Sequence, residues 1–181
     1  MKIWKSFAAS GITHSMAHYL TAIHGLRARM GYARVSDVAR ELDVTKGSVS
    51  IQVKHLREKG LVEEDRNRFL LLTPGGEEIA HELLQNRKIL TEFLVALLGI
   101  EEDQAKVDAC KMEHLLSRDT CHRLLALVHL IQSDDPAARQ FRERFRQYSL
   151  DCSGAGVCRL CSVEHGSEAI REEVRGGTSG I

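Results

Sequence analysis

Apolar residues recur at helical spacing from about residue 15 to about residue 60, with polar positions between them. A repeat of about 3.6 residues predicts amphipathic helices. One is expected over about residues 15–29, with Ser15 as its cap. Two shorter helices are expected over about 35–42 and 46–59, joined by a tight turn at 43–45. Two short helices with a tight turn between them are typical of a helix-turn-helix.

The pattern then changes to two short apolar runs. Residues 61–64 and 68–72 flank a polar tip at 65–67, which predicts a small two-stranded hairpin, the wing. Thr73 followed by Pro74 gives a cap with proline at the first helical position, and apolar residues continue a long helix toward Gly99.

Three more helices are expected, near 104–116, near 120–131 and from Pro136 to about Tyr148. The middle one is apolar around most of its circumference, so it needs partners on several sides. A dimer interface would supply one of them. The rest of the chain is rich in Gly, Ser and charge, and it is expected to form no core of its own.

Charge is uneven along the chain, although Lys and Arg balance Asp and Glu at 25 each. Residues 1–72 hold twelve basic against seven acidic residues, and residues 73–181 hold thirteen against eighteen. A basic first part suggests contact with phosphates, and an acidic second part suggests contact with cations or protein. No stretch of about 18 apolar residues and no signal peptide is evident, so a cytoplasmic protein is expected.

The third expected helix has one packing face and one free face. Val49, Val53 and Leu56 lie on the first, and small or polar residues dominate the second. Small side chains near the helix start let a backbone approach base edges in a major groove, and nearby basic residues can contact phosphates. An ordinary solvated face is the other interpretation. The expected DNA-contacting residues are Lys46, Ser48, Ser50, Ile51, Lys54, Arg66 and Arg68.

A set of metal donors lies on the helix expected near 104–116. Cys110, Glu113 and His114 are spaced i, i+3 and i+4, so they form one stripe and present a thiolate, a carboxylate and an imidazole to one point. A buried cysteine beside a surface Glu-His pair is the alternative.

The segment 108–117, Asp-Ala-Cys-Lys-Met-Glu-His-Leu-Leu-Ser, resembles the metal-binding helix of the diphtheria-toxin-repressor family. The likeness runs from about Ser15 to Ile131 and includes residues 31–37 and 72–74. It implies a homodimeric repressor that binds an inverted-repeat operator in double-stranded DNA and controls metal-homeostasis genes. The family takes one more ligand from its first helix, which implies His18 here, so the implied ligands are His18, Cys110, Glu113 and His114.

The chain also departs from that family. Arg87 and Thr91 stand where the family usually supplies a His and an acid to a second metal position, which is therefore lost or rebuilt. His81 and Glu82 are candidates for rebuilt ligands, although an exposed pair is the simpler interpretation. The fold class expected is mainly α, with a winged helix-turn-helix DNA-binding domain over 1–73, a helical metal-binding and dimerisation domain over 74–148, and a Cys-containing tail over 149–181.

The tail carries a second donor set, and its chemistry is open. Zinc could be held there without help from the rest of the chain, whereas an iron-sulfur cluster needs a fourth ligand, for which Cys121, the tail's histidine or a group of the partner chain could serve. A redox dithiol or inert thiols are further alternatives. The tail residues concerned are Cys152, Cys158, Cys161 and His165.

A metal-responsive repressor is the function expected, with the metal joining the two domains and fixing their angle. Iron(II) is favoured because Cys110 is a soft ligand, and manganese(II), zinc or cobalt are possible. A redox or iron-sulfur sensor acting through the tail is the main alternative. A small metallohydrolase is disfavoured, because the chain lacks H-E-x-x-H, so no enzyme is expected.

Overall fold

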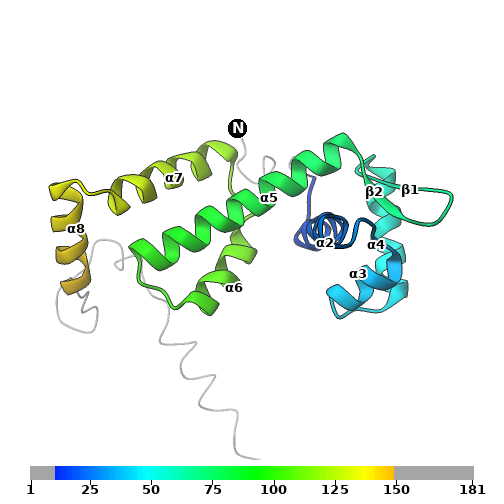
Figure 1. Cartoon of the computed structure of the whole chain (residues 1–181), viewed down its shortest axis with the longest axis horizontal. Helices are drawn as coiled ribbons and strands as arrows, with labels where there is room; N and C mark the ends of the chain where they lie inside the picture. Colours follow the sequence, from blue (N-terminus) through cyan, green and yellow to red (C-terminus); the bar gives the residue numbers. More distant parts are fainter. Residues whose placement is uncertain (1–10, 149–181) are drawn as a thin grey trace, which may run out of the picture. The chain divides into compact units, whose positions relative to one another are not determined.

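The computed structural model describes residues 11–148, which are mainly helical (Figure 1). The first described helix, α2 (His14–Met30), is capped by Thr13, whose hydroxyl accepts a hydrogen bond from the Met16 amide at 3.2 Å. The cap is therefore Thr13 rather than Ser15, and the helix begins before the predicted start. Gly31 ends α2 with φ of 80°, a left-handed conformation that favours glycine.

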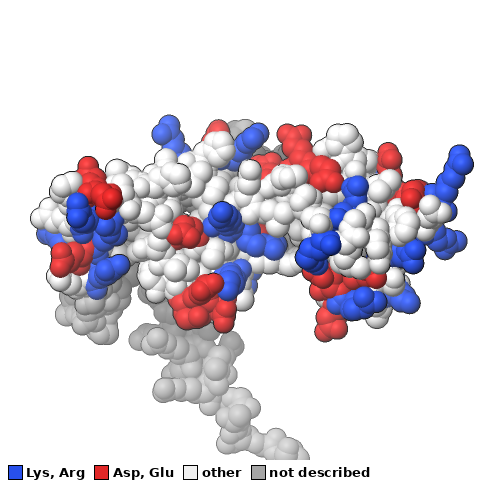
Figure 2. Space-filling model, viewed as in Figure 1, with Lys and Arg blue, Asp and Glu red and all other residues white. Residues whose placement is uncertain are grey.

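The winged helix-turn-helix is present as predicted. Helix α3 (Val35–Glu41) is followed by α4 (Lys46–Glu58), whose cap Thr45 accepts a hydrogen bond from the Ser48 amide at 3.1 Å. Strands β1 (Val62–Glu64) and β2 (Leu70–Leu72) then pair antiparallel to form the wing. Figure 2 shows basic side chains projecting at the end of the molecule that carries the wing.

A long helix continues from the wing. Helix α5 (Pro74–Glu92) has Thr73 as its cap and Pro74 at the first position, as predicted, and it passes into a π-helical segment η1 (Phe93–Leu97). Three helices follow, α6 (Glu102–Met112), α7 (Arg118–Gln132) and α8 (Pro136–Gln147). None of the helices within residues 11–148 is long and apolar enough to cross a membrane.

Two apolar clusters hold these elements. The first joins α2, α3, α4 and the wing around fully buried residues such as Leu20, Val49 and Leu70. The second joins α5, η1 and α6 around Leu90 and Ala109. Helix α5 packs against α2 at one end and α6 at the other, so it connects the two clusters (Figure 1). Within the described residues, 11–142 form one compact unit, and the end of α8 from Glu143 falls in another.

Candidate functional site

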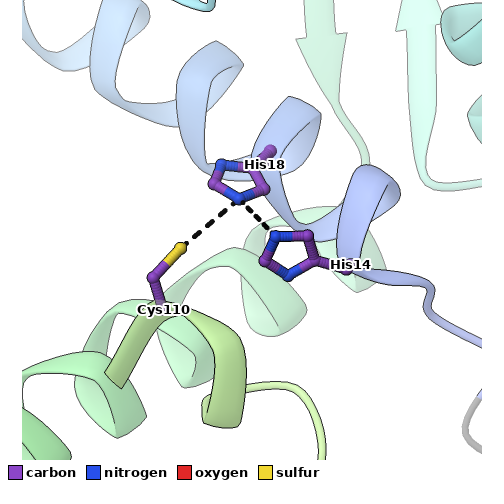
Figure 3. A group of neighbouring side chains, drawn as sticks. All are labelled: His14, His18 and Cys110. Carbon is purple, nitrogen blue, oxygen red and sulfur yellow. Dashed lines mark hydrogen bonds between the residues drawn. The ribbon is translucent and has the colours of Figure 1, made fainter. Parts of the chain in front are cut away.

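Helices α2 and α6 bring together two of the predicted metal ligands. His18 Nε2 lies 3.4 Å from the Sγ of Cys110, although the two residues are 92 positions apart in the chain. One turn earlier on α2, His14 adds a second imidazole, and its Nε2 lies 3.0 Å from that of His18. The three side chains point toward one another, and one donor atom from each lies within 4.8 Å of the others (Figure 3).

These separations fit a bound transition metal. Zinc bonds of about 2.0–2.1 Å to nitrogen and about 2.3 Å to sulfur place tetrahedral donors about 3.3–3.6 Å apart. The 3.0 Å between the two imidazole nitrogens and the 3.4 Å between His18 and Cys110 lie close to that range. The donor atoms of His14 and Cys110 lie within 4.8 Å of each other, so a side-chain adjustment that leaves both helices in place would bring all three donors to one divalent metal.

His14 was missed in the sequence, and the reason is the position of the helix start. With Ser15 as the expected cap, His14 lay outside the helix and had no defined direction. With Thr13 as the cap, His14 is the first helical residue and shares a face with His18 at i, i+4. The spacing of the two histidines was the signal that could have found it.

The electrostatics of two of the histidines favour the neutral imidazole that metal binding requires. Burial lowers the pKa of His18, and the neighbouring His14 and Arg87 lower it further. Burial and then His14 also lower the pKa of His114. These two imidazoles thus keep a free lone pair at neutral pH. Burial raises the pKa of the Cys110 thiol, which favours the protonated form at neutral pH, and a metal that binds the sulfur would displace that proton.

Glu113 has a different partner from the one predicted. Its side chain is fully buried, and Arg87 holds both carboxylate oxygens, with Nε to Oε2 at 2.5 Å and Nη2 to Oε1 at 2.7 Å. The hydrogen bond to Glu113 raises the pKa of Arg87, which therefore stays charged. Nη2 also lies 4.0 Å from the Sγ of Cys110. In this structure the Glu113 carboxylate is engaged by a guanidinium.

His114 lies at the edge of the same cluster. Its ring centroid is 4.9 Å from that of His14. Within residues 11–148, its Nδ1 is buried and has no hydrogen-bond partner. A buried nitrogen without a partner is costly, and a bound cation or a water molecule is the usual remedy. Thr91 donates its hydroxyl hydrogen bond to the Arg87 carbonyl of its own helix at 2.8 Å.

Cys121 and the tail residues were the candidate ligands of a second metal or cluster, and of these the structure describes only Cys121. Cys121 on α7 is fully buried, and burial raises the pKa of its thiol. The tail donors lie outside the described residues; they are Cys152, Cys158, Cys161 and His165.

The predicted DNA-contacting residues are all exposed, and the packing residues Val49, Val53 and Leu56 are all buried. Several of the predicted DNA-contacting residues line a groove between α4 and the wing. Arg34 also lines this groove and was missed in the sequence, because its place depends on a tertiary contact: its guanidinium carbon lies 4.6 Å from the centre of the Phe69 ring. The basic residues of the groove are Arg34, Lys46, Lys54, Arg57 and Arg68.

Comparison with known proteins agrees with this architecture. Residues 11–70 match the family model described as the iron-dependent repressor N-terminal DNA-binding domain, and residues 73–140 match the iron-dependent repressor metal-binding and dimerisation domain. The HTH-type transcriptional regulator MntR of Lysinibacillus sphaericus (strain C3-41) is 33% identical over 138 residues, which cover 76% of this chain and 99% of that protein. MntR of Bacillus subtilis (strain 168) is 32% identical, with coverages of 72% and 91%.

Solved structures give the same result. The manganese regulator SloR matches with a TM-score of 0.58 and 27% identity, over 62% of this chain and 53% of that one. T. acidophilum IdeR matches with a TM-score of 0.53 and 26% identity, over 61% and 52%. The chain thus spans about half the length of these two solved relatives. It belongs to the iron-dependent repressor family, also known as the diphtheria-toxin-repressor family, and is a metal-dependent, DNA-binding transcriptional repressor rather than an enzyme.

Proposed function

We propose that this repressor senses its metal between α2 and α6, with His14, His18 and Cys110 as the ligands and His114 as the nearest further donor. The observation that carries this proposal is the 3.4 Å approach of His18 to Cys110, across 92 positions of chain. Glu113 belongs to the ligand set implied by the family resemblance, and it can join only where Arg87 releases its carboxylate.

A metal shared by these residues would couple the two apolar clusters. His14 and His18 belong to α2, which packs with the recognition helix α4, and Cys110 belongs to α6 in the second cluster. Shared ligation would therefore favour one angle between the clusters by population shift. In a homodimer that angle sets the spacing of two recognition helices on an inverted-repeat operator. Such a regulator of metal-homeostasis genes would act in the cytoplasm.

For the metal itself we propose iron(II). Two imidazoles and a thiolate form a softer donor set than the oxygen ligands that suit manganese(II), and they hold zinc or cobalt(II) at least as tightly as iron(II). Two of the structures that this chain resembles are titled as a manganese regulator and a manganese-dependent repressor, which makes manganese(II) the main competitor.

The test uses the metal-free, full-length protein under anaerobic conditions. Binding to a duplex selected from a random pool would be followed by fluorescence anisotropy with iron(II), manganese(II), zinc or cobalt(II) added in turn. We expect His18→Ala and Cys110→Ser to abolish metal-stimulated binding while the dimer persists. His122→Ala, at an exposed position on α7, is the matched control and should respond like wild type.

The same assay separates the internal site from the tail. If the tail senses metal or redox state instead, Cys158→Ser with Cys161→Ser would abolish the response, and Cys110→Ser would retain it. That result would overturn the assignment of the sensing site to α2 and α6. Glu113→Gln and His14→Ala, compared side by side, then decide which of the two residues completes the ligand set.

A further inference from the structure

A second group of metal donors lies where α2 meets the start of α5. His24 on α2 and Glu77 and His81 on α5 each place one donor atom within 4.8 Å of the others. His24 follows His18 by six residues, which is about 9 Å along a helix and about 120° around it. The group is therefore separate from the cluster around Cys110, and it contains no thiol.

The Glu77 carboxylate sits at the centre of this group. His24 Nδ1 lies 2.8 Å from Oε2, and Arg27 Nη1 lies 3.2 Å from the other oxygen, Oε1. The guanidinium therefore orients the carboxylate and leaves Oε2 directed at the imidazole. Both side chains are partly shielded from water, with exposed fractions of 22% for His24 and 35% for Glu77.

His81 is oriented in the way that a metal-binding histidine usually is. Its Nδ1 lies 3.0 Å from the backbone carbonyl oxygen of Glu77, to which it can only donate. That bond places the ring proton on Nδ1 and leaves Nε2 with a free lone pair, as in sites where a carbonyl fixes the tautomer of a ligating imidazole. The ring packs against that of His24, with centroids 4.7 Å apart and planes at 72°.

A simple ion pair accounts for only part of this arrangement. The contacts of Glu77 with His24 and Arg27 would form without any metal ion, but they do not explain why His81 lies beside them. Glu77 and His81 are spaced i, i+4 on α5, so both face α2 from the same side of the helix. Two imidazoles and one carboxylate oxygen are the protein ligands of many three-ligand zinc sites.

We propose that His24, Glu77 and His81 form a second divalent-metal site, which takes zinc or another late transition metal that prefers imidazole. The site joins the helix before the helix-turn-helix to the helix that follows the wing, so a bound ion would hold both ends of the DNA-binding unit together. Its donor set lacks sulfur, so it should prefer different metals from the set that includes Cys110. The proposal does not depend on the metal site between α2 and α6.

Histidine modification by diethyl pyrocarbonate, mapped by mass spectrometry, tests the proposal in the metal-free, full-length protein with zinc as the probe. Zinc bound at Nε2 blocks the reagent. At free zinc about ten times the dissociation constant, about one site in eleven is empty, so modification of His81 should slow about tenfold. The exposed His55 on α4 and His122 on α7 should react at unchanged rates and serve as internal controls.

Variants assign the protection to this site. Glu77→Gln should remove most of it, whereas the exposed neighbour substitution Glu78→Gln should leave it intact. Because Glu77 also contacts two other side chains, His24→Asn provides a second disabling variant, and circular dichroism confirms that each is folded. The double variant His18→Ala, Cys110→Ser should keep the full protection. Equal modification of His81 with and without zinc, or protection lost only in that double variant, would overturn the proposal.

Discussion

Replacing Arg87 by methionine would leave a fully buried carboxylate without its partner. Both oxygens of Glu113 accept hydrogen bonds from the guanidinium, and the exposed fraction of the Glu113 side chain is 0%. Methionine keeps an unbranched stem and a similar helix propensity while removing the charge and the donors. The substitution therefore tests the ion pair with little change in packing.

The expected loss of stability follows from how deeply Arg87 and Glu113 are buried. Removing one member of a fully buried pair costs about 3–5 kcal/mol, because the other charge stays desolvated. The Arg87 side chain has an exposed fraction of 32%, so water can reach the position that the guanidinium leaves. We therefore expect Arg87→Met to lower the free energy of unfolding by about 2–3 kcal/mol, at or just below the lower end of that range.

Urea denaturation of the metal-free protein, followed by circular dichroism at one fixed protein concentration, measures this loss. Glu113→Gln removes the charge instead of its partner, and the double variant Arg87→Met, Glu113→Gln completes the cycle. We expect the double variant to be more stable than Arg87→Met alone, since a neutral amide is cheaper to bury than an unpaired carboxylate. A stability for Arg87→Met within about 0.5 kcal/mol of wild type, the usual range for a surface substitution, would refute the reasoning.

Metal titration of the double variant Arg87→Met, Glu113→Gln also separates the two ligand sets. Arg87→Met alone should tighten metal binding in either case, because it removes a positive charge 4.0 Å from the sulfur of Cys110. The double variant keeps the net charge of the wild-type pair, so its metal affinity should match wild type if His14, His18 and Cys110 suffice and should fall if Glu113 coordinates the metal.

Three further outcomes test the fold, the DNA surface and the dimer. Gly76→Ala should lower the free energy of unfolding, measured by urea denaturation, by about 1–3 kcal/mol, because the new Cβ would lie 2.0 Å from the Leu61 carbonyl oxygen. Gly75→Ala is the control and should not lower it in this way, because its Cβ would meet nothing closer than 3.9 Å. Lys54→Ala should weaken binding to any duplex and reduce the salt slope by about one; an unchanged slope would contradict phosphate contact. Leu130→Glu, at a 59% exposed position on α7, should turn the dimer into a monomer in sedimentation.

The order of helices could be predicted from the sequence because each boundary has a local cause. Thr73 and Pro74 start α5, and Thr45 caps α4, whose buried residues recur at helical spacing. The π-helical segment Phe93–Leu97 could not be predicted. It falls in the apolar run 93–98, and a run without polar positions carries no periodicity to show where the helical register changes.

The candidate site was only partly predictable, for a similar reason. Cys110, Glu113 and His114 lie within five consecutive positions of an expected helix, so their spacing was visible, although α6 ends at Met112 with Glu113 as its C-cap. His18 was placed by family resemblance. His14 was lost through an error of two residues in the helix start. The partners of Arg87, His24 and Arg34 depend on how separate helices and the wing pack, and no local pattern encodes those contacts.

Arg87 gives a physical reason to expect that the second metal position implied by the family resemblance is not kept in this chain. The resemblance implies a second metal position near this residue, which the family usually supplies with a histidine. Here a guanidinium, charged at all pH values of interest, neutralises the buried Glu113 and lies 4.0 Å from the sulfur of Cys110. A second divalent ion beside it would meet like charge at close range, at a cost that burial increases. In this structure one fixed cation thus balances the carboxylate, and the ligands that we propose for the exchangeable metal are the imidazoles of α2 and the thiolate of α6.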